Sequence, residues 1–305
     1  MKLLLDIIFS ADFLHSVIRL STPLLFATMA ALISDRAGVL NIGIEGTMLF
    51  SALMGVVGSA YLGNVWLGVC VAVLAGIAFS ALISFFHLKM ETDIVLTGIA
   101  LNLMSSGLTI FILYLLTGDK GVSTGLPSKT VPNIAIPIID RIPVLGDVLS
   151  GHSVLTYGAF LLVAVIAVFL KRTRLGTYIR AAGENSDSVE TAGISVKKIR
   201  LKALLISGAI SGLGGAFMSM AYVSMFTKDM IAGRGFIALA AEAMGHGTPW
   251  LSMLSTLLFG LADALGNNLQ LFNLPSELTR LMPYVFTIFA LAIYAAQEKR
   301  KNKDK

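Results

Sequence analysis

Charged residues and cysteines are scarce in this chain. Lys, Arg, Asp and Glu together make up 13% of its 305 residues, about half the share found in soluble domains. Hydrophobic residues make up 56%, so a water-soluble fold of this length could not cover its surface with polar groups. The single cysteine, Cys70, excludes an intramolecular disulfide and a sulfur-rich metal site. These shortages exclude a soluble globular protein and indicate a polytopic membrane protein.

The sequence also lacks the motifs of catalysis. It has no GxxxxGK[ST] loop to cradle a nucleotide, so the chain is not expected to hydrolyse ATP. It has no HExxH, no GxSxG and no His, Cys and carboxylate residues at the spacing of a metal site or a nucleophilic triad. We therefore expect no catalytic residues, no metal site and no cofactor bound by this chain.

Six uncharged apolar runs are each close to the length that spans about 30 Å of hydrocarbon. A shorter run, Leu20–Ser34, can extend back through Phe13–Arg19, and the stretch Phe236–Ala262 is interrupted by glycines and a proline. The sequence predicts an all-α, polytopic transmembrane bundle of eight to ten helices, with broken or re-entrant helices, as one domain over residues 1–305. The six clear runs are Thr47–Val65, Trp66–Phe86, Ile94–Leu116, Ser153–Leu170, Ala203–Thr227 and Leu281–Gln297.

The net charge of +5 indicates membrane topology rather than a nucleic-acid partner, because the basic residues are clustered. Lys171–Lys202 holds eight basic residues against three acidic ones, and the tail Glu298–Lys305 holds five against two. Cytoplasmic loops are rich in Lys and Arg, so both segments are expected in the cytoplasm. Counting spans back then puts Gly118–Gly151 outside and Ser34–Gly43 inside. The interrupted stretch Phe236–Ala262 either crosses twice or forms a hairpin.

The outer segment Gly118–Gly151 is long and contains four prolines. It is either an irregular connector or a vestibule that docks a partner delivering the substrate. The cytoplasmic segment Lys171–Lys202 carries a more specific signal. Asp187 and Glu190 have the spacing of a capping box, and Gly193 suits a left-handed C-cap, so we expect a short helix of about two turns. That helix is either a solvated connector or a peg for a cytoplasmic motor subunit.

A stripe of small residues follows this cytoplasmic segment. Small residues at a spacing of four let helix backbones approach closely in lipid. The stripe therefore predicts tight helix packing, inside the chain or at a seam between subunits. Its members are Ser207, Gly208, Ser211, Gly212 and Gly215.

Two polar, glycine-bearing interruptions occur in the two halves of the chain, at Asp35–Gly46 and at Gly233–Gly245. Each has an arginine followed by a glutamate at a similar distance, Glu45 in the first and Glu242 in the second. Broken helices in corresponding positions point to a transport site at the membrane midplane. Ionisable groups inside a membrane usually face a cavity or each other, so both glutamates are candidate pathway residues. Glu45 is equally well interpreted as a structural carboxylate that caps backbone amides or pairs with an arginine.

Several amide side chains also fall within apolar runs. Amides can bind neutral polar solutes through donors and acceptors without burying a charge. They bridge helices equally well. Asn41, Asn102 and Asn268 therefore join Glu45 and Glu242 as the predicted pathway residues.

Four stretches, taken together, resemble a known family. They are DRAGVLNIGIEG at Asp35–Gly46, ETDIVLTGIALNL at Glu91–Leu103, AGENSDSVETAGI at Ala182–Ile194 and SGAISGLGGA at Ser207–Ala216. In order and extent they are similar to the permease subunits of bacterial ABC importers for branched-chain amino acids, simple sugars and nucleosides. The first two stretches look most like the nucleoside, guanosine-type branch.

This resemblance implies a permease in the bacterial plasma membrane, with a cytoplasmic C-terminus, that carries a small-molecule solute by alternating access. It implies three kinds of partner: a second homologous permease, an ATP-binding subunit that uses ATP and Mg, and an extracytoplasmic substrate-binding lipoprotein. The segment 171–202 would hold the coupling loop that contacts the ATP-binding subunit. The residues matching that loop are Glu184, Asn185, Asp187, Glu190, Gly193 and Ile194.

Two alternatives to a nucleoside importer remain open. The first is an importer permease for simple sugars or branched-chain amino acids, although the predominance of amides over fixed charges favours a neutral solute. The second is an ion-coupled secondary transporter, in which Glu45, Glu242 and Asp263 would carry protons or sodium. Such a transporter would work as this chain alone, driven by an ion gradient.

Overall fold

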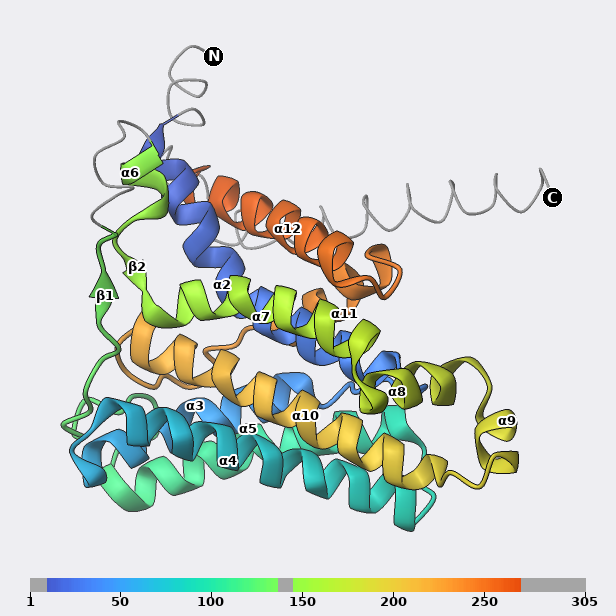
Figure 1. Cartoon of the computed structure of the whole chain (residues 1–305). Coiled ribbons are helices and arrows are strands. Elements are labelled where there is room, and N and C mark those ends of the chain that lie inside the picture. Colours follow the sequence, from blue (N-terminus) through green and yellow to red (C-terminus); the bar gives the residue numbers. More distant parts are fainter. Residues whose placement is uncertain (1–9, 137–144, 270–305) are drawn as a thin grey trace.

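The computed structural model describes residues 10–136 and 145–269, which form a bundle of helices (Figure 1). Within that part of the chain, seven helices are long and apolar enough to cross a membrane. The predicted all-α membrane fold is confirmed. The long helices are α2 (Ala11–Asp35), α3 (Ile44–Leu62), α4 (Val65–Ser84), α5 (Ile94–Thr117), α7 (Val154–Arg172), α10 (Val196–Phe217) and α12 (Pro249–Leu269).

Shorter elements connect or extend these helices. Two π-helical turns continue α4 and α10, at Phe85–Lys89 and Met218–Tyr222 respectively. Strands β1 (Asn133–Ile134) and β2 (His152–Ser153) form a small antiparallel pair. The remaining short helices are α6 (Leu145–Leu149), α8 (Arg174–Glu184), α9 (Ser186–Thr191) and α11 (Arg234–Met244).

Capping residues fix where the long helices begin and end. Asn64 accepts a hydrogen bond from the Trp66 amide at 2.8 Å, and Asp93 accepts one from the Leu96 amide at 2.8 Å. Such side chains satisfy amides that have no partner within the helix. Gly63 ends α3 with a φ of 62°, a left-handed conformation that glycine adopts without steric cost.

Helix α10 lies at the centre of the bundle and packs against α2, α3 and α4 (Figure 1). A Cβ atom on Gly208 would lie 2.5 Å from the Gly76 carbonyl oxygen, and one on Gly212 would lie 2.7 Å from the Ala72 oxygen. Ser207 and Ser211 are fully buried beside them, and Gly215 packs against α3. The small-residue stripe therefore lies inside the chain, which excludes its use as a seam between subunits.

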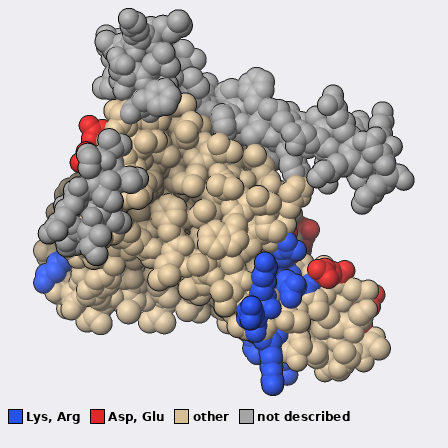
Figure 2. All heavy atoms as spheres, turned by 45° about the horizontal axis from the view of Figure 1, so that its top comes forward, with Lys and Arg blue, Asp and Glu red and all other residues tan. Residues whose placement is uncertain are grey.

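The two ends of the bundle differ in composition. We call one the basic end: it holds α8, α9 and the turns after α2, α4 and α11, which contact one another. The other is the loop end, where the described parts of residues 118–153 lie and Val122 bridges to Thr227. The outer segment and the basic segment thus lie at opposite ends, as the charge pattern predicts. Figure 2 shows Lys and Arg gathered at one end, while a broad surface beside them carries almost no charge.

At the loop end, the outer segment packs against the bundle. The His152 ring stacks on His15 with 3.9 Å between ring centroids. Burial lowers the pKa of His152, so this imidazole is neutral at pH 7. The Ser123 amide donates to the Phe226 carbonyl at 3.0 Å, which ties this segment to the chain that follows α10.

One predicted helix boundary is wrong, and the structure settles the two segments whose extent the sequence left open. The run Ala203–Thr227 is helical from Val196 to Tyr222, because basic residues end an apolar run without ending a helix. The stretch Phe236–Ala262 is two helices, α11 and α12, separated at residues 245–248. Leu20–Ser34 does extend through Phe13–Arg19, as α2. The predicted span Leu281–Gln297 and the basic tail lie outside the described residues.

Candidate translocation pathway and coupling surface

The first break is the non-helical segment of residues 36–43 between α2 and α3. Two predicted pathway amides hold it. The Asn41 amide nitrogen donates to Ser207 Oγ of α10 at 3.1 Å. Asn102, more than two turns inside α5, donates to the Ile42 carbonyl at 3.0 Å and accepts from the Gly46 amide at 2.8 Å. Helix α3 therefore begins inside the bundle rather than level with the end of α2.

Glu45, in the first turn of α3, caps a helix from the other half of the chain. Its Oε1 accepts a hydrogen bond from the Gly233 amide at 2.7 Å, and its Oε2 accepts one from the Gly235 amide at 2.7 Å. These amides start α11, where unpaired N–H groups and the helix dipole favour a carboxylate. Of the two interpretations of Glu45 from the sequence, the structural one describes these contacts.

Gly235 lies so close to Glu45 that no side chain fits between them. A Cβ atom on Gly235 would lie 2.7 Å from the Glu45 nitrogen and 2.8 Å from its Oε2. Arg234 lies between the two capped glycines, and its Nη2 is 3.7 Å from Oδ2 of Asp263 in α12. In the sequence Gly-Arg-Gly, the second glycine therefore allows the close contact with Glu45, and the arginine forms the ion pair with Asp263.

Arg36 holds the other end of α11. Its Nε donates to the Gly247 carbonyl at 2.7 Å and its Nη2 donates to the His246 carbonyl at 2.8 Å. Both carbonyls belong to the turn between α11 and α12, and both residues have positive φ, 50° at His246 and 62° at Gly247. Helix α11 is thus held at both of its ends, by Arg36 in the first break and by Glu45 in the first turn of α3 that follows it.

Glu242 is buried on α11, with 4% of its surface exposed. Its Oε1 has no hydrogen-bond partner among the described residues. The nearest charges that act on it are those of Asp35 and Arg36, one of each sign. Glu242 therefore faces the basic end, away from Glu45, and the structure does not bring the two glutamates together.

The second break, residues 223–233, contains functional candidates that the sequence did not reveal. It runs from the loop end into the bundle as non-helical chain, with positive φ at Ser224, Asp229 and Ala232. The carboxylate of Asp229 is exposed and accepts a hydrogen bond at 2.7 Å from Ser106, near the middle of α5. A charged group and open backbone at this depth are too costly to face lipid. This face must border water or a partner chain.

The predicted pathway residues separate into groups. Asn41, Glu45 and Asn102 all lie at the start of α3, whereas Glu242 lies toward the basic end. Asn268 lies near the end of α12 and donates to the Ala264 carbonyl of its own helix at 2.9 Å. The contacts of these side chains are internal to the chain, and their role toward a solute stays a prediction.

The predicted coupling segment projects from the basic end as α8 and α9 (Figure 1). Most of α9 is exposed, and Val189 is its buried anchor. The predicted capping box is wrong: Asn185 caps α9 by accepting from the Ser188 amide at 3.0 Å, because Asp187 is already inside the helix. Gly193 has a φ of 79°, as expected for a left-handed cap.

The coupling segment contacts the first break directly. Gly183, at the end of α8, packs against the carbonyl of Arg36, and a Cβ atom at Gly38 would lie 3.2 Å from the Gly183 Cα. Arg200 of α10 donates to the Ala37 carbonyl at 3.3 Å. Residues 36–38 are therefore the point where α8, α10 and the turn after α11 meet.

Within this architecture, the fold is that of an ABC transporter permease. A solved structure described as an inward-facing conformation of a putative metal-chelate type ABC transporter aligns with a TM-score of 0.52, at 16% identity. The alignment covers 95% of this chain and 88% of that one. At this identity the similarity concerns the fold alone.

The chain belongs to the family described as the permease component of the branched-chain amino acid transport system, whose model matches residues 13–291. It is 36% identical to a putative glucose ABC transporter permease protein of Haloferax volcanii, over 84% of this chain and 77% of that protein. It is 33% identical to a nucleoside ABC transporter permease protein of Lactococcus lactis, over 90% and 89% of the two chains. A guanosine ABC transporter permease protein of Bacillus subtilis is also 33% identical, over 89% and 88%. The chain is thus a multi-pass membrane protein and a permease component of an ABC transporter.

Proposed function

We propose that this chain is the membrane-spanning subunit of an ATP-driven importer of nucleosides in the plasma membrane. It would pair with a second, homologous permease, an ATP-binding subunit that uses ATP and Mg, and an extracytoplasmic lipoprotein that delivers the solute. The observation that carries the proposal is that α11 is held at both ends, at its start by Glu45 and at its end by Arg36. Arg36 also contacts Gly183 of α8 in the projecting coupling segment.

The proposed translocation path runs along the face formed by α5 and the second break. Asp229 is exposed and Ser106 is half-buried there at membrane depth, and the adjacent start of α11 carries the capped Gly233. A second permease facing this surface would enclose it as a water-filled path. In that arrangement Glu45 and Asn102 fix the wall of the path, and Asp229 and Ser106 contact water or solute.

Coupling follows from the contacts of residues 36–38. A push on α9 by an ATP-binding subunit would move α8, and Gly183 would transmit that movement to Arg36. Arg36 is hydrogen-bonded to the turn after α11 and Glu45 to its start. Movement at the basic end would therefore shift α11 as a rigid lever, changing access to the path without covalent chemistry.

The solute class is inferred from the names of the relatives and from the side chains along the proposed path. Two relatives of similar identity are named for nucleosides or guanosine, and one is named a putative glucose permease. Both solutes are neutral and rich in hydroxyl groups, which can hydrogen-bond to the carboxylate, hydroxyl and amide side chains along this path. A simple-sugar importer is therefore the second candidate.

Uptake of radiolabelled solutes tests this proposal. Cells with and without the chain would be compared for uptake of guanosine, cytidine, glucose, ribose and leucine, each with unlabelled competitors. We expect the chain to be required for nucleoside uptake alone, with inhibition by vanadate. Loss of glucose or ribose uptake instead would keep the importer and replace the solute. Uptake by this chain alone, driven by an ion gradient and insensitive to vanadate, would overturn the importer.

Substitutions in the coupling segment test the lever separately. Gly193→Val places a β-branched residue at a φ of 79°, which costs about 1–2 kcal/mol, and it should reorient α9. We expect transport per ATP hydrolysed to fall several-fold while the protein level stays normal. Gly193→Asn is the matched control, because Asn tolerates left-handed φ. Glu190→Lys, which reverses an exposed charge on α9, should also uncouple ATP hydrolysis from transport.

A further inference from the structure

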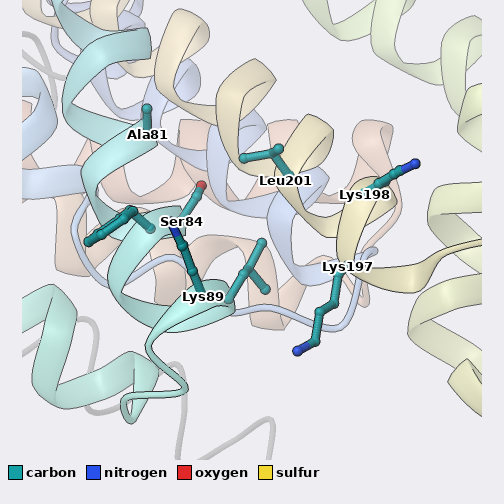
Figure 3. A pocket seen from close by; sticks show the side chains of 8 residues that line it. Ala81, Ser84, Lys89, Lys197, Lys198 and Leu201 are labelled. Atoms are coloured by element: carbon teal, nitrogen blue, oxygen red, sulfur yellow. The ribbon is translucent and has the colours of Figure 1, made fainter.

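A groove of about 560 Å³ opens at the basic end, between the π-helical turn that ends α4 and the start of α10 (Figure 3). Its floor is apolar, formed by Ala81, Leu88 and Leu201. Its rim carries three lysines, Lys89, Lys197 and Lys198. None of these residues holds α11 or belongs to α8 or α9, although Lys197, Lys198 and Leu201 lie at the end of the predicted coupling segment 171–202. The groove is therefore separate from the contacts described above.

The groove exists because two helices that pack tightly in the bundle diverge at its edge. Within the bundle, Ser80 Oγ of α4 donates to the Leu204 carbonyl of α10 at 2.7 Å, one turn above Leu201. Below Ser84, helix α4 changes to a π-helical turn, Phe85–Lys89, which is wider than an α-helical turn. The wider turn moves away from α10 and leaves the wedge-shaped space that Figure 3 shows.

The groove lies at the depth where lipid acyl chains meet headgroups. Leu82, Phe85 and Phe86 are 42%, 44% and 37% exposed on the adjoining face of α4, as expected for side chains that face lipid. Lys89 follows within one turn at the end of this helix, and Lys197 and Lys198 lie in the first turn of α10. This order, apolar and then basic, matches the cytoplasmic boundary of a bilayer, where anionic lipids attract basic side chains.

The net charge at the rim of the groove is positive even when the ion pair between Lys197 and Glu91 is included. Lys197 Nζ lies 3.1 Å from Glu91 Oε1, and both side chains are mostly exposed, at 66% and 76%. Lys89 Nζ lies over the Phe85 ring at 5.2 Å from its centroid. Three lysines against one glutamate leave an excess of two positive charges beside an apolar floor. An amphiphile with a negative headgroup complements both features.

We propose that this groove binds an anionic phospholipid of the cytoplasmic leaflet. One acyl chain would lie along Ala81, Leu88 and Leu201, and the phosphate would contact Lys89 and Lys197. The bound lipid would fill the wedge between α4 and α10 and so stabilise the divergence of the two helices. Glu91 would compete with the lipid phosphate for Lys197.

Native mass spectrometry of the delipidated, purified transporter tests the proposal. The complex would be titrated with phosphatidylglycerol and with phosphatidylcholine of the same acyl chains. Each lysine near a membrane surface contributes about 1 kcal/mol toward an anionic lipid, or about fivefold in affinity. We therefore expect Lys89→Gln/Lys197→Gln to weaken phosphatidylglycerol binding by about 25-fold and to leave phosphatidylcholine binding unchanged.

Two control variants, and one variant that should strengthen lipid binding, make the test more specific. Lys171→Gln/Arg172→Gln removes the same charge from the basic end at the end of α7, outside the groove, and should leave binding unchanged. Glu91→Gln should strengthen phosphatidylglycerol binding about fivefold, because it frees Lys197. Ala81→Trp fills the floor and should abolish phosphatidylglycerol binding with all lysines present, whereas glycerol phosphate at millimolar concentration should not compete.

The results would overturn the proposal in either of two ways. Equal weakening by the groove and the α7 double variants would mean that the basic end attracts anionic lipids without a site. Competition by glycerol phosphate, together with unchanged binding in Ala81→Trp, would mean a surface phosphate contact without an acyl-chain groove. Because variants with opposite expected signs are compared in one complex, loss of folding cannot imitate the expected pattern.

Discussion

The two polar interruptions in the sequence have different structures: Asp35–Gly46 contains the first break, whereas Gly233–Gly245 is mostly the helix α11, and the second break comes before it. The first break, residues 36–43, is short and is held by side chains from two helices, α5 and α10, and a full-length helix follows it. The second, residues 223–233, holds several residues with positive φ and an exposed carboxylate, and an 11-residue half-helix follows it. Arg36 in the first break and Glu45 directly after it form the hydrogen bonds that hold α11, the helix that follows the second break.

The glutamates show the same asymmetry. Both carboxylate oxygens of Glu45 accept backbone hydrogen bonds, whereas Glu242 has an oxygen without a partner among the described residues. A carboxylate whose two oxygens both accept hydrogen bonds at a helix start stabilises one geometry. A buried carboxylate oxygen without a hydrogen-bond partner lowers the stability of the fold. The comparison teaches that an Arg-to-Glu spacing shared by two halves does not imply a shared role.

Substitution of Gly235 should break the comparison most strongly. In Gly235→Ala, the added methyl would overlap the backbone and carboxylate of Glu45, so the start of α11 must move and both cap hydrogen bonds must lengthen. We expect a cost of about 3 kcal/mol and loss of most transport activity. Uptake and the amount of protein in the membrane would be measured together. Gly158→Ala on α7 is the control, since no atom lies within 4 Å of a Cβ there. Normal transport activity in Gly235→Ala would refute the proposal that Glu45 must hold the start of α11.

Glu45→Gln should have the next largest effect. Glutamine keeps one acceptor for the α11 amides and turns an NH2 group toward the other, so one charge-assisted hydrogen bond is lost. We expect about 2 kcal/mol of destabilisation and a clear drop in uptake. Thermal unfolding of the purified complex would measure the first, and radiolabelled uptake the second. Full activity with unchanged stability would make this carboxylate incidental.

Arg36→Lys sharpens the coupling part of the comparison. Lysine keeps the positive charge but cannot donate to two carbonyls in the planar geometry of arginine. We expect a stability loss of about 1 kcal/mol, with a larger fall in transport per ATP hydrolysed than in ATP hydrolysis itself. Arg172→Lys, also at the basic end, is the matched control. Equal losses of both activities would place Arg36 in folding rather than in transmission.

Glu242→Gln should have the smallest effect. The amide has nearly the same shape and replaces a buried carboxylate whose Oε1 has no partner within the described ranges, so stability should stay the same or rise by up to about 1 kcal/mol. Uptake should stay near the normal level across pH. A strong loss of uptake here would revive the ion-coupled transporter, in which this carboxyl carries a proton.

The parts of the fold that depend on hydrophobic runs follow from the sequence, and the parts that depend on long-range contacts do not. Runs such as Ile94–Leu116 predict α5 to within one residue at its end, because lipid thickness sets their length. The pairing of Glu45 with Gly233 joins residues 188 positions apart, and no local spacing encodes it. The sequence predicts that both are special, but only the fold shows that one caps the other.

The same limit applies to the residues that the sequence missed. The sequence marks Arg36 only as part of a motif. Its acceptor is the backbone carbonyl of Gly247, and a backbone carbonyl cannot be recognised from the pattern of side chains. Asp229 lies in a segment whose apolar neighbours extend a helical run, and only the backbone break exposes it. The capping box at Asp187 misled because Asn185, two residues earlier, offers an equivalent side chain to the same helix start.

The separation between Glu45 and its amide partners also bears on how the protein is made. At the usual rate of translation, roughly 10 to 40 seconds pass between synthesis of the two regions. During that interval the first turn of α3 holds a carboxylate with neither acceptor bond formed, so it must stay hydrated until α11 arrives. Final seating of α3 is therefore a late event in biogenesis, and nascent chains that stop short of α11 should be early targets for membrane quality control.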